Sequence, residues 1–81
     1  MMIRLRLFAF FRQEFGAPEV AYEIAEGSTV GDLLESIFKK YPSLEKSRGH
    51  NVVTINRVPV KMEMQIHDGD EIVILPPVSG G

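Results

Sequence analysis

Apolar and polar residues alternate from the start of the chain, which predicts a first β-strand. The residues on one side are Ile3, Leu5, Leu7 and Ala9, and those on the other are Arg4, Arg6, Phe8 and Phe10. Residues 11–15 are expected to form a helical turn closed by Gly16, since glycine readily takes the left-handed conformation of a helix C-cap. Pro18 opens a second alternating strand, residues 19–25, and the two strands are expected to pair as an antiparallel hairpin.

An amphipathic helix follows the turn at residues 26–28. Thr29 is a natural N-cap, and Asp32 is favourable in the first helical turn because the helix dipole attracts negative charge there. Apolar residues then recur with helical spacing at Val30, Leu33, Leu34, Ile37, Phe38 and Tyr41. Pro42 ends the helix, and the polar stretch from residue 43 to residue 51 is predicted to be a loop, with room for one further turn.

Three shorter strands complete the pattern. Residues 52–55 form a nearly continuous apolar strand that suits the interior of a sheet. A tight turn at Asn56 leads to residues 58–60, where Pro59 indicates an edge strand. An Asp-Gly turn at residues 67–70 precedes the last strand, residues 71–75. One main helix on a mixed sheet of four to five strands predicts an α+β, ubiquitin-like β-grasp fold with the first and last strands as parallel neighbours.

Six residues remain after the last strand: Pro76, Pro77, Val78, Ser79, Gly80 and Gly81. The two prolines stop the ladder and favour a stiff, extended segment, with a reach of about 20 Å for the six residues. The two glycines lack Cβ atoms, so they pass a narrow channel. We therefore predict a domain of residues 1–75 and a tail of residues 76–81 that delivers the Gly81 carboxylate into a partner. The alternative is an ordinary frayed terminus.

Composition narrows the class of function. A chain of 81 residues corresponds to one small domain, and its net charge of −2 gives no electrostatic reason to expect a nucleic-acid partner. Zero cysteines exclude a disulfide framework and a cysteine nucleophile. The sequence holds no apolar run of membrane-spanning length, and a cytoplasmic location is expected.

The remaining polar residues give weak signals for catalysis. His50 and His67 lack the spacing of clustered metal ligands, so no metal site is predicted. Asp68, Asp70 and Glu71 form an acidic group, for which a turn that stabilises its own backbone is favoured over acid–base chemistry. A secondary role in guiding a partner is also open. Ser79 has no candidate base near it in the chain and is expected to hydrogen-bond to a partner's channel.

The surplus of apolar residues on the first and last strands predicts a docking face. Both sides of the last strand are apolar, and a single helix covers only one side of the sheet. Small monomers seldom expose such a patch without a use for it. We expect Phe8, Leu75 and Pro59 to contribute to a docking face beside the point where the tail leaves the domain.

The sequence resembles the small, sulfur-carrying subunit of molybdopterin synthase over nearly its whole length. The matching positions are Phe8-Ala9 with Arg12, Gly16, Thr29-Val30 before Leu33-Leu34, Ile55-Asn56, Asp68-Gly69-Asp70-Glu71 and Pro76-Pro77-Val78-Ser79-Gly80-Gly81. The Gly-Gly end is shared by β-grasp sulfur carriers in general. The Pro-Pro-Val-Ser-Gly-Gly ending is more specific to the molybdopterin branch, because the related thiamine carrier usually lacks the proline pair.

The resemblance implies a carrier rather than an enzyme in its own right. An ATP-dependent adenylating enzyme would activate the carboxylate of Gly81, and a sulfur donor protein would convert it into a thiocarboxylate. The large subunit of molybdopterin synthase would then take up the tail and pass the sulfur to a pterin precursor, with the catalytic side chains on that subunit. The carrier itself would bind no cofactor, and ATP would be used by the activating enzyme.

Two other functions use the same features. A ubiquitin-like protein modifier would join Gly81 to lysines of target proteins, and a thiamine-type sulfur carrier would use the same Gly-Gly tail. A plain interaction domain with an incidental Gly-Gly end would keep its activity after the tail is removed.

Overall fold

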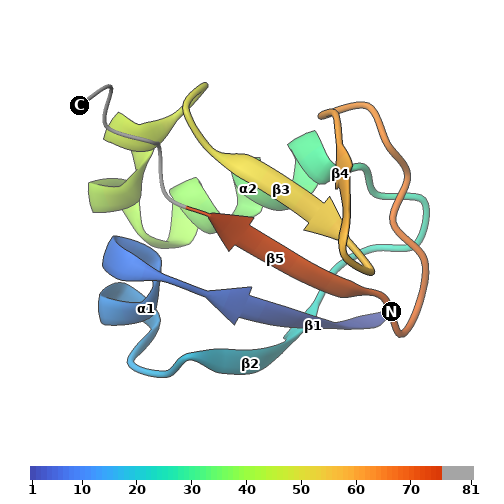
Figure 1. Cartoon of the computed structure of the whole chain (residues 1–81), viewed down its shortest axis with the longest axis horizontal. Coiled ribbons are helices and arrows are strands. Elements are labelled where there is room, and N and C mark those ends of the chain that lie inside the picture. The colour runs from blue at the N-terminus through green and yellow to red at the C-terminus, as the bar shows by residue number, and fades with distance from the viewer. Residues whose placement is uncertain (76–81) are drawn as a thin grey trace.

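Five strands form one mixed sheet in the order β2-β1-β5-β3-β4 (Figure 1). In the computed structural model, which describes residues 1–75, the strands are β1 (Met2–Leu7), β2 (Glu19–Glu23), β3 (Val52–Ile55), β4 (Val58–Val60) and β5 (Glu71–Leu75). The helical segments are α1 (Ala9–Phe15), α2 (Val30–Lys40) and the 3-10 helix η1 (Pro42–Ser47). The predicted tail, residues 76–81, lies outside the described residues.

The two central strands come from opposite ends of the chain. β1 pairs with β5 in parallel, β2 pairs with the outer side of β1 in antiparallel fashion, and β3 is antiparallel to both β5 and β4. Helix α2 crosses one face of this sheet (Figure 1). The predicted α+β, ubiquitin-like β-grasp architecture is therefore confirmed.

Helix α2 begins and packs as its sequence predicts. The amide of Asp32 donates to Thr29 Oγ1 at 3.2 Å, and the amide of Thr29 donates to Asp32 Oδ2 at 3.0 Å, so the two residues form a reciprocal capping box. The predicted apolar face is buried at Val30, Leu33, Leu34, Ile37 and Phe38.

The core lies between α2 and the central strands. Its members on the strands alternate along the chain, as expected for side chains that share one face of a sheet. The buried strand residues in this cluster are Ile3, Leu5, Leu7, Val53, Ile72 and Ile74. The opposite face of the sheet therefore carries the intervening residues of each strand.

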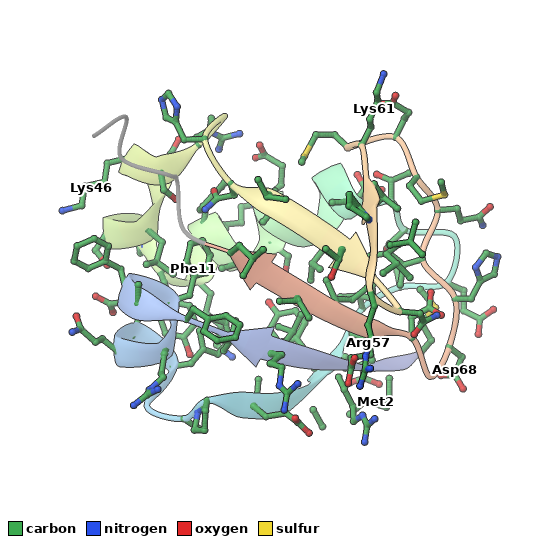
Figure 2. All side chains as sticks on the ribbon, viewed as in Figure 1. Met2, Phe11, Lys46, Arg57, Lys61 and Asp68 are labelled. Carbon is green, nitrogen blue, oxygen red and sulfur yellow. The ribbon has the colours of Figure 1, made fainter. Side chains whose placement is uncertain are left out.

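The prediction that the first strand continues through Phe10 is wrong. β1 ends at Leu7, and Ala9 takes a positive φ of 51° that turns the chain into α1. β2 accounts for this end, because its register stops at the pair Arg6↔Glu19 and leaves a longer β1 without a partner on that side. The turn also buries Phe11, labelled in Figure 2, whose ring centroid lies 6.4 Å from that of Phe38.

Two other boundaries differ from the sequence pattern. β2 ends at Glu23 rather than at residue 25. The stretch predicted to be a loop contains η1, which buries Leu44 at 3% exposure. A single core residue among polar neighbours gives no periodic signal, so the sequence offers no basis for predicting its burial. Between residues 1 and 75, no helix has the length and apolarity that a membrane crossing requires.

Candidate functional site

The residue that precedes the predicted tail, Leu75, ends β5 at the centre of the sheet. Its backbone pairs with Val52 of β3, and its side chain is half-buried. β1 runs parallel to β5, so the C-terminal ends of both strands lie at the same end of the sheet. The predicted tail residues, namely Pro76, Pro77, Val78, Ser79, Gly80 and Gly81, lie outside the described residues, and their roles in threading and chemistry stay predictions.

The face of the sheet opposite α2 has an apolar centre. Along β5, Ile72 and Ile74 are fully buried, whereas Val73 and Leu75 point to the other face and are half-buried. In an extended strand, successive side chains project to opposite faces, so both faces of β5 are apolar as predicted. We call the second face, carrying Val73 and Leu75, the open face.

Phe8 extends this apolar surface next to the end of β5. It precedes α1 with φ −133° and ψ 159°, an extended conformation that continues the alternation of β1 by one residue. Since Leu7 pairs with Ile74, Phe8 follows beside Leu75 on the open face. Its side chain is 39% exposed. The structure thus brings Phe8 and Leu75 together at the base of the predicted tail.

Pro59 lies on the same face but at the edge of the sheet. It pairs with Thr54 of β3, and Thr54 pairs with Val73 of β5, so the three side chains form one row across the open face. β3 separates Pro59 from β5. Within the predicted docking face, Pro59 therefore forms a border, whereas Phe8 and Leu75 form the part nearest the tail.

Two ion pairs frame the open face on its β1 side. Arg4 Nη2 lies 3.8 Å from Glu71 Oε2, and Arg6 Nε lies 3.9 Å from Glu19 Oε2. Both arginine side chains are more than half exposed, and exposed ion pairs typically contribute only about 0–1 kcal/mol. The arginine N–H groups therefore remain accessible to a partner that covers the apolar centre.

The carboxylates of the acidic turn before β5 accept hydrogen bonds from neighbouring backbone and side-chain groups. Asp70 Oδ2 accepts from the amide of His67 at 2.8 Å, and Asp70 Oδ1 accepts from Asn56 Nδ2 at 3.1 Å. Asp68 Oδ1 accepts from the amide of Met2 at 2.9 Å, a neighbourhood that can be followed in Figure 2. These contacts support the structural interpretation of the acidic group. In residues 1–75, no cluster of His, Asp or Glu side chains is suited to hold a metal ion.

A second charged group lies on the helix side, away from the open face. Arg48 forms hydrogen-bonded ion pairs with Glu35 and Glu45, and its guanidinium lies 4.9 Å from the ring centroid of Phe38. The hydrogen bond from Arg48 lowers the pKa of the Glu35 carboxyl below its ordinary value. All three charges have partners within the domain, so this group is adequately explained by the packing of η1 against α2.

One side chain that contacts the end of β5 is not among those predicted from the sequence. Asn51, in the stretch predicted to be a polar loop, donates from Nδ2 to the carbonyl of Leu75 at 3.4 Å. The two residues are 24 positions apart in the chain. The spacing of apolar residues gives no signal for such a contact, because the contact joins polar groups far apart in the chain.

Chemically, residues 1–75 provide an apolar surface beside the strand end from which the predicted tail continues. A mixed sheet in the order β2-β1-β5-β3-β4, crossed by one helix, places the protein in the class of ubiquitin-like β-grasp proteins. The model of the ThiS family matches residues 5–81. The chain belongs to this family.

Similar proteins match over the whole of this chain, and a solved structure shares its fold. A molybdopterin synthase sulfur carrier subunit of Chlamydomonas reinhardtii is 34% identical over 83 residues, covering 100% of both chains. Small archaeal modifier protein 3 of Haloferax volcanii is 32% identical over 92 residues, also covering 100% of both. The solution structure of a Haloferax volcanii protein superposes with a TM-score of 0.88 at 32% identity, covering 100% of this chain and 87% of that one. The predicted resemblance to the sulfur-carrying subunit is confirmed.

Proposed function

We propose that this protein is the sulfur-carrying small subunit of a molybdopterin synthase. An ATP-dependent adenylating enzyme activates the carboxylate of Gly81, and a sulfur donor protein converts the acyl-adenylate into a thiocarboxylate. The large subunit then receives the tail and transfers the sulfur to a pterin precursor. We expect this cycle in the cytoplasm, with the catalytic side chains on the large subunit and no cofactor bound to the carrier.

The proposal rests on a molybdopterin synthase sulfur carrier subunit that is 34% identical over the whole chain, together with a family match that continues through residue 81, beyond the end of β5 at Leu75. The similarity therefore includes the six residues that follow the last strand. A tail that follows the central strand beside an apolar open face suits a carrier whose end reacts in another protein's active site.

The chemistry of the tail fits this cycle. A carboxylate is a poor electrophile, and adenylation gives it a good leaving group, AMP. Displacement of AMP by a sulfur donor leaves a C-terminal thiocarboxylate, an anionic sulfur nucleophile at the end of an extended arm. The open face, with Phe8 and Leu75 near the tail and Pro59 at its border, would dock on the large subunit. Binding energy from this remote surface would help to place the reacting sulfur.

Reconstitution tests the proposal. The protein, loaded with sulfur at Gly81, is mixed with the large subunit and the pterin precursor, and the dithiolene product is measured by chromatography. We expect product in proportion to loaded protein, and none from protein that has only been adenylated. Loaded protein that binds the large subunit but yields no product would contradict the proposed function.

A second function has its own support, because one similar protein is named small archaeal modifier protein 3. A modifier would use the same adenylate but transfer Gly81 to a lysine amine of a target, releasing AMP. Denaturing gels of cell extracts, probed for this protein, separate the two functions. Species of high mass that disappear when Gly81 is deleted would favour the modifier, and a single band of carrier size would favour sulfur transfer alone.

A further inference from the structure

The end of β5 is held by a side chain as well as by its strand neighbours. Val52↔Leu75 is the last pair of the β3–β5 register. Directly before Val52, the half-buried Asn51 donates from Nδ2 to the carbonyl of Leu75 at 3.4 Å. This hydrogen bond joins the start of β3 to the last backbone carbonyl before residue 76.

The Asn51 amide is held on its other side as well. Ser47 Oγ lies 3.1 Å from Asn51 Oδ1 and 2.7 Å from the carbonyl of Leu44, and its single proton is shared between these two acceptors. Because the Leu75 carbonyl can only accept, the NH2 group of Asn51 faces it, and Ser47 Oγ holds the amide oxygen on the other side. Leu44 is only 3% exposed, so the whole arrangement is anchored in the core through η1.

We propose that Asn51, oriented by Ser47, is a positioning residue for the sulfur transfer described above, and the inference rests on that proposed function. A peptide group is planar, so a held Leu75 carbonyl fixes the plane of the bond to Pro76. Proline also restricts the residue before it to extended conformations. Together these constraints restrict the backbone of Leu75, from which the predicted tail continues.

A small change of direction at Leu75 becomes a large displacement at Gly81. Six extended residues span about 20 Å, and misplacing a reacting group by about 1 Å can lower a rate about 100-fold. The open face docks whether or not the tail is directed, because Phe8 and Leu75 supply that contact. Loss of the Asn51 donor should therefore slow transfer within the complex rather than weaken the complex.

The matched variants are Asn51→Asp and Ser47→Ala, with His50→Ala as the control at an exposed neighbour. Asn51→Asp keeps the shape of the side chain but replaces the donor by a charged acceptor, whereas Ser47→Ala keeps the donor and removes the partner of the amide oxygen. Each loaded protein is mixed with saturating large subunit, and the single-turnover rate of sulfur release is measured. Titration calorimetry gives the Kd of each complex, and thermal unfolding confirms that each variant is folded at the assay temperature.

We expect Asn51→Asp to lower the transfer rate about tenfold, consistent with a sub-ångström misplacement, and to change the Kd less than about twofold. Ser47→Ala should fall between it and the wild type, and His50→Ala should match the wild type. An unchanged transfer rate for Asn51→Asp would overturn the proposal. A weaker Kd with an unchanged rate would also overturn it, since Asn51 would then be a docking contact.

A measurement on the unloaded protein keeps this test separate from the proposed function. The ¹⁵N order parameter of the Val78 amide reports how strongly motion at the start of the tail is restricted on the ps–ns timescale, with or without sulfur chemistry. We expect it to fall in Asn51→Asp and to stay unchanged in His50→Ala. If the wild-type protein failed to transfer sulfur but this difference appeared, the proposed function would be wrong and the positioning would stand. An unchanged order parameter would refute the positioning itself.

Discussion

Replacing Phe8 by alanine should weaken the complex with the large subunit while lowering the stability of the fold only modestly. Phe8 is 39% exposed, so about three-fifths of its surface is covered in the free protein. Full burial of a phenylalanine side chain stabilises a fold by about 1.5–3 kcal/mol. Phe8→Ala should therefore lower the free energy of unfolding by about 1–2 kcal/mol, with no closed cavity to add to the loss.

In the complex, the exposed part of Phe8 would also be covered, together with the neighbouring Leu75. Truncating an anchor residue of this kind to alanine lowers the binding free energy by more than about 1 kcal/mol, which raises the Kd about fivefold or more. Met62→Ala is the matched control, because Met62 is 40% exposed and its carbonyl accepts from Gly31 at the start of α2, away from the open face.

Titration calorimetry of each variant against the large subunit, alongside urea unfolding, separates docking from folding. We expect a weaker complex for Phe8→Ala and an unchanged Kd for Met62→Ala. Equal affinities for the wild type and Phe8→Ala, together with a loss of several kcal/mol in stability, would refute the reasoning. Phe8 would then belong to the core, and the docking face would have to lie elsewhere.

Two further predictions concern the fold itself. Ile37 is fully buried in α2, and Ile37→Ala removes roughly three of its carbon atoms, so the free energy of unfolding should fall by about 2–5 kcal/mol. The Kd for the large subunit, measured at low temperature, should stay unchanged. A weaker complex from a stable variant would show that α2 binds the partner. Arg57 has a positive φ of 72° in the turn between β3 and β4, a conformation that glycine adopts without strain. Arg57→Gly should therefore raise the free energy of unfolding, measured by urea titration, by about 0.5–1 kcal/mol. A decrease would contradict this interpretation of the turn.

The fold was predictable because apolar residues recur with a clear spacing in its main helix and strands. The helical spacing from Val30 to Phe38 and the apolar residues of β5 define both layers of the domain. The reversal at Ala9 was not predictable, because an alanine with positive φ leaves no signature in the sequence. It depends on the end of β2 and on the burial of Phe11, both of which are tertiary features.

The candidate site was predictable in part. The parallel pairing of the first and last strands places Phe8 beside Leu75, which the topology implied. The link from Asn51 to Leu75 joins residues 24 positions apart, and hydrogen bonds between side chain and backbone at such separation follow no pattern of hydrophobic residues. The strand pattern therefore predicts where the tail begins, whereas the hydrogen bond from Asn51 to Leu75 is visible only in the structure.

The central claim is that Gly81 carries the sulfur, and an intact-mass measurement tests it most directly. The full-length protein and a variant lacking Gly81 are incubated with ATP, the adenylating enzyme and a sulfur source, and fragmentation locates any change of mass. We predict the exchange of one oxygen for one sulfur at the C-terminus of the full-length protein. The shortened variant should show no such exchange and the same thermal unfolding. Sulfur loading of the variant to the same extent as the full-length protein would contradict the account.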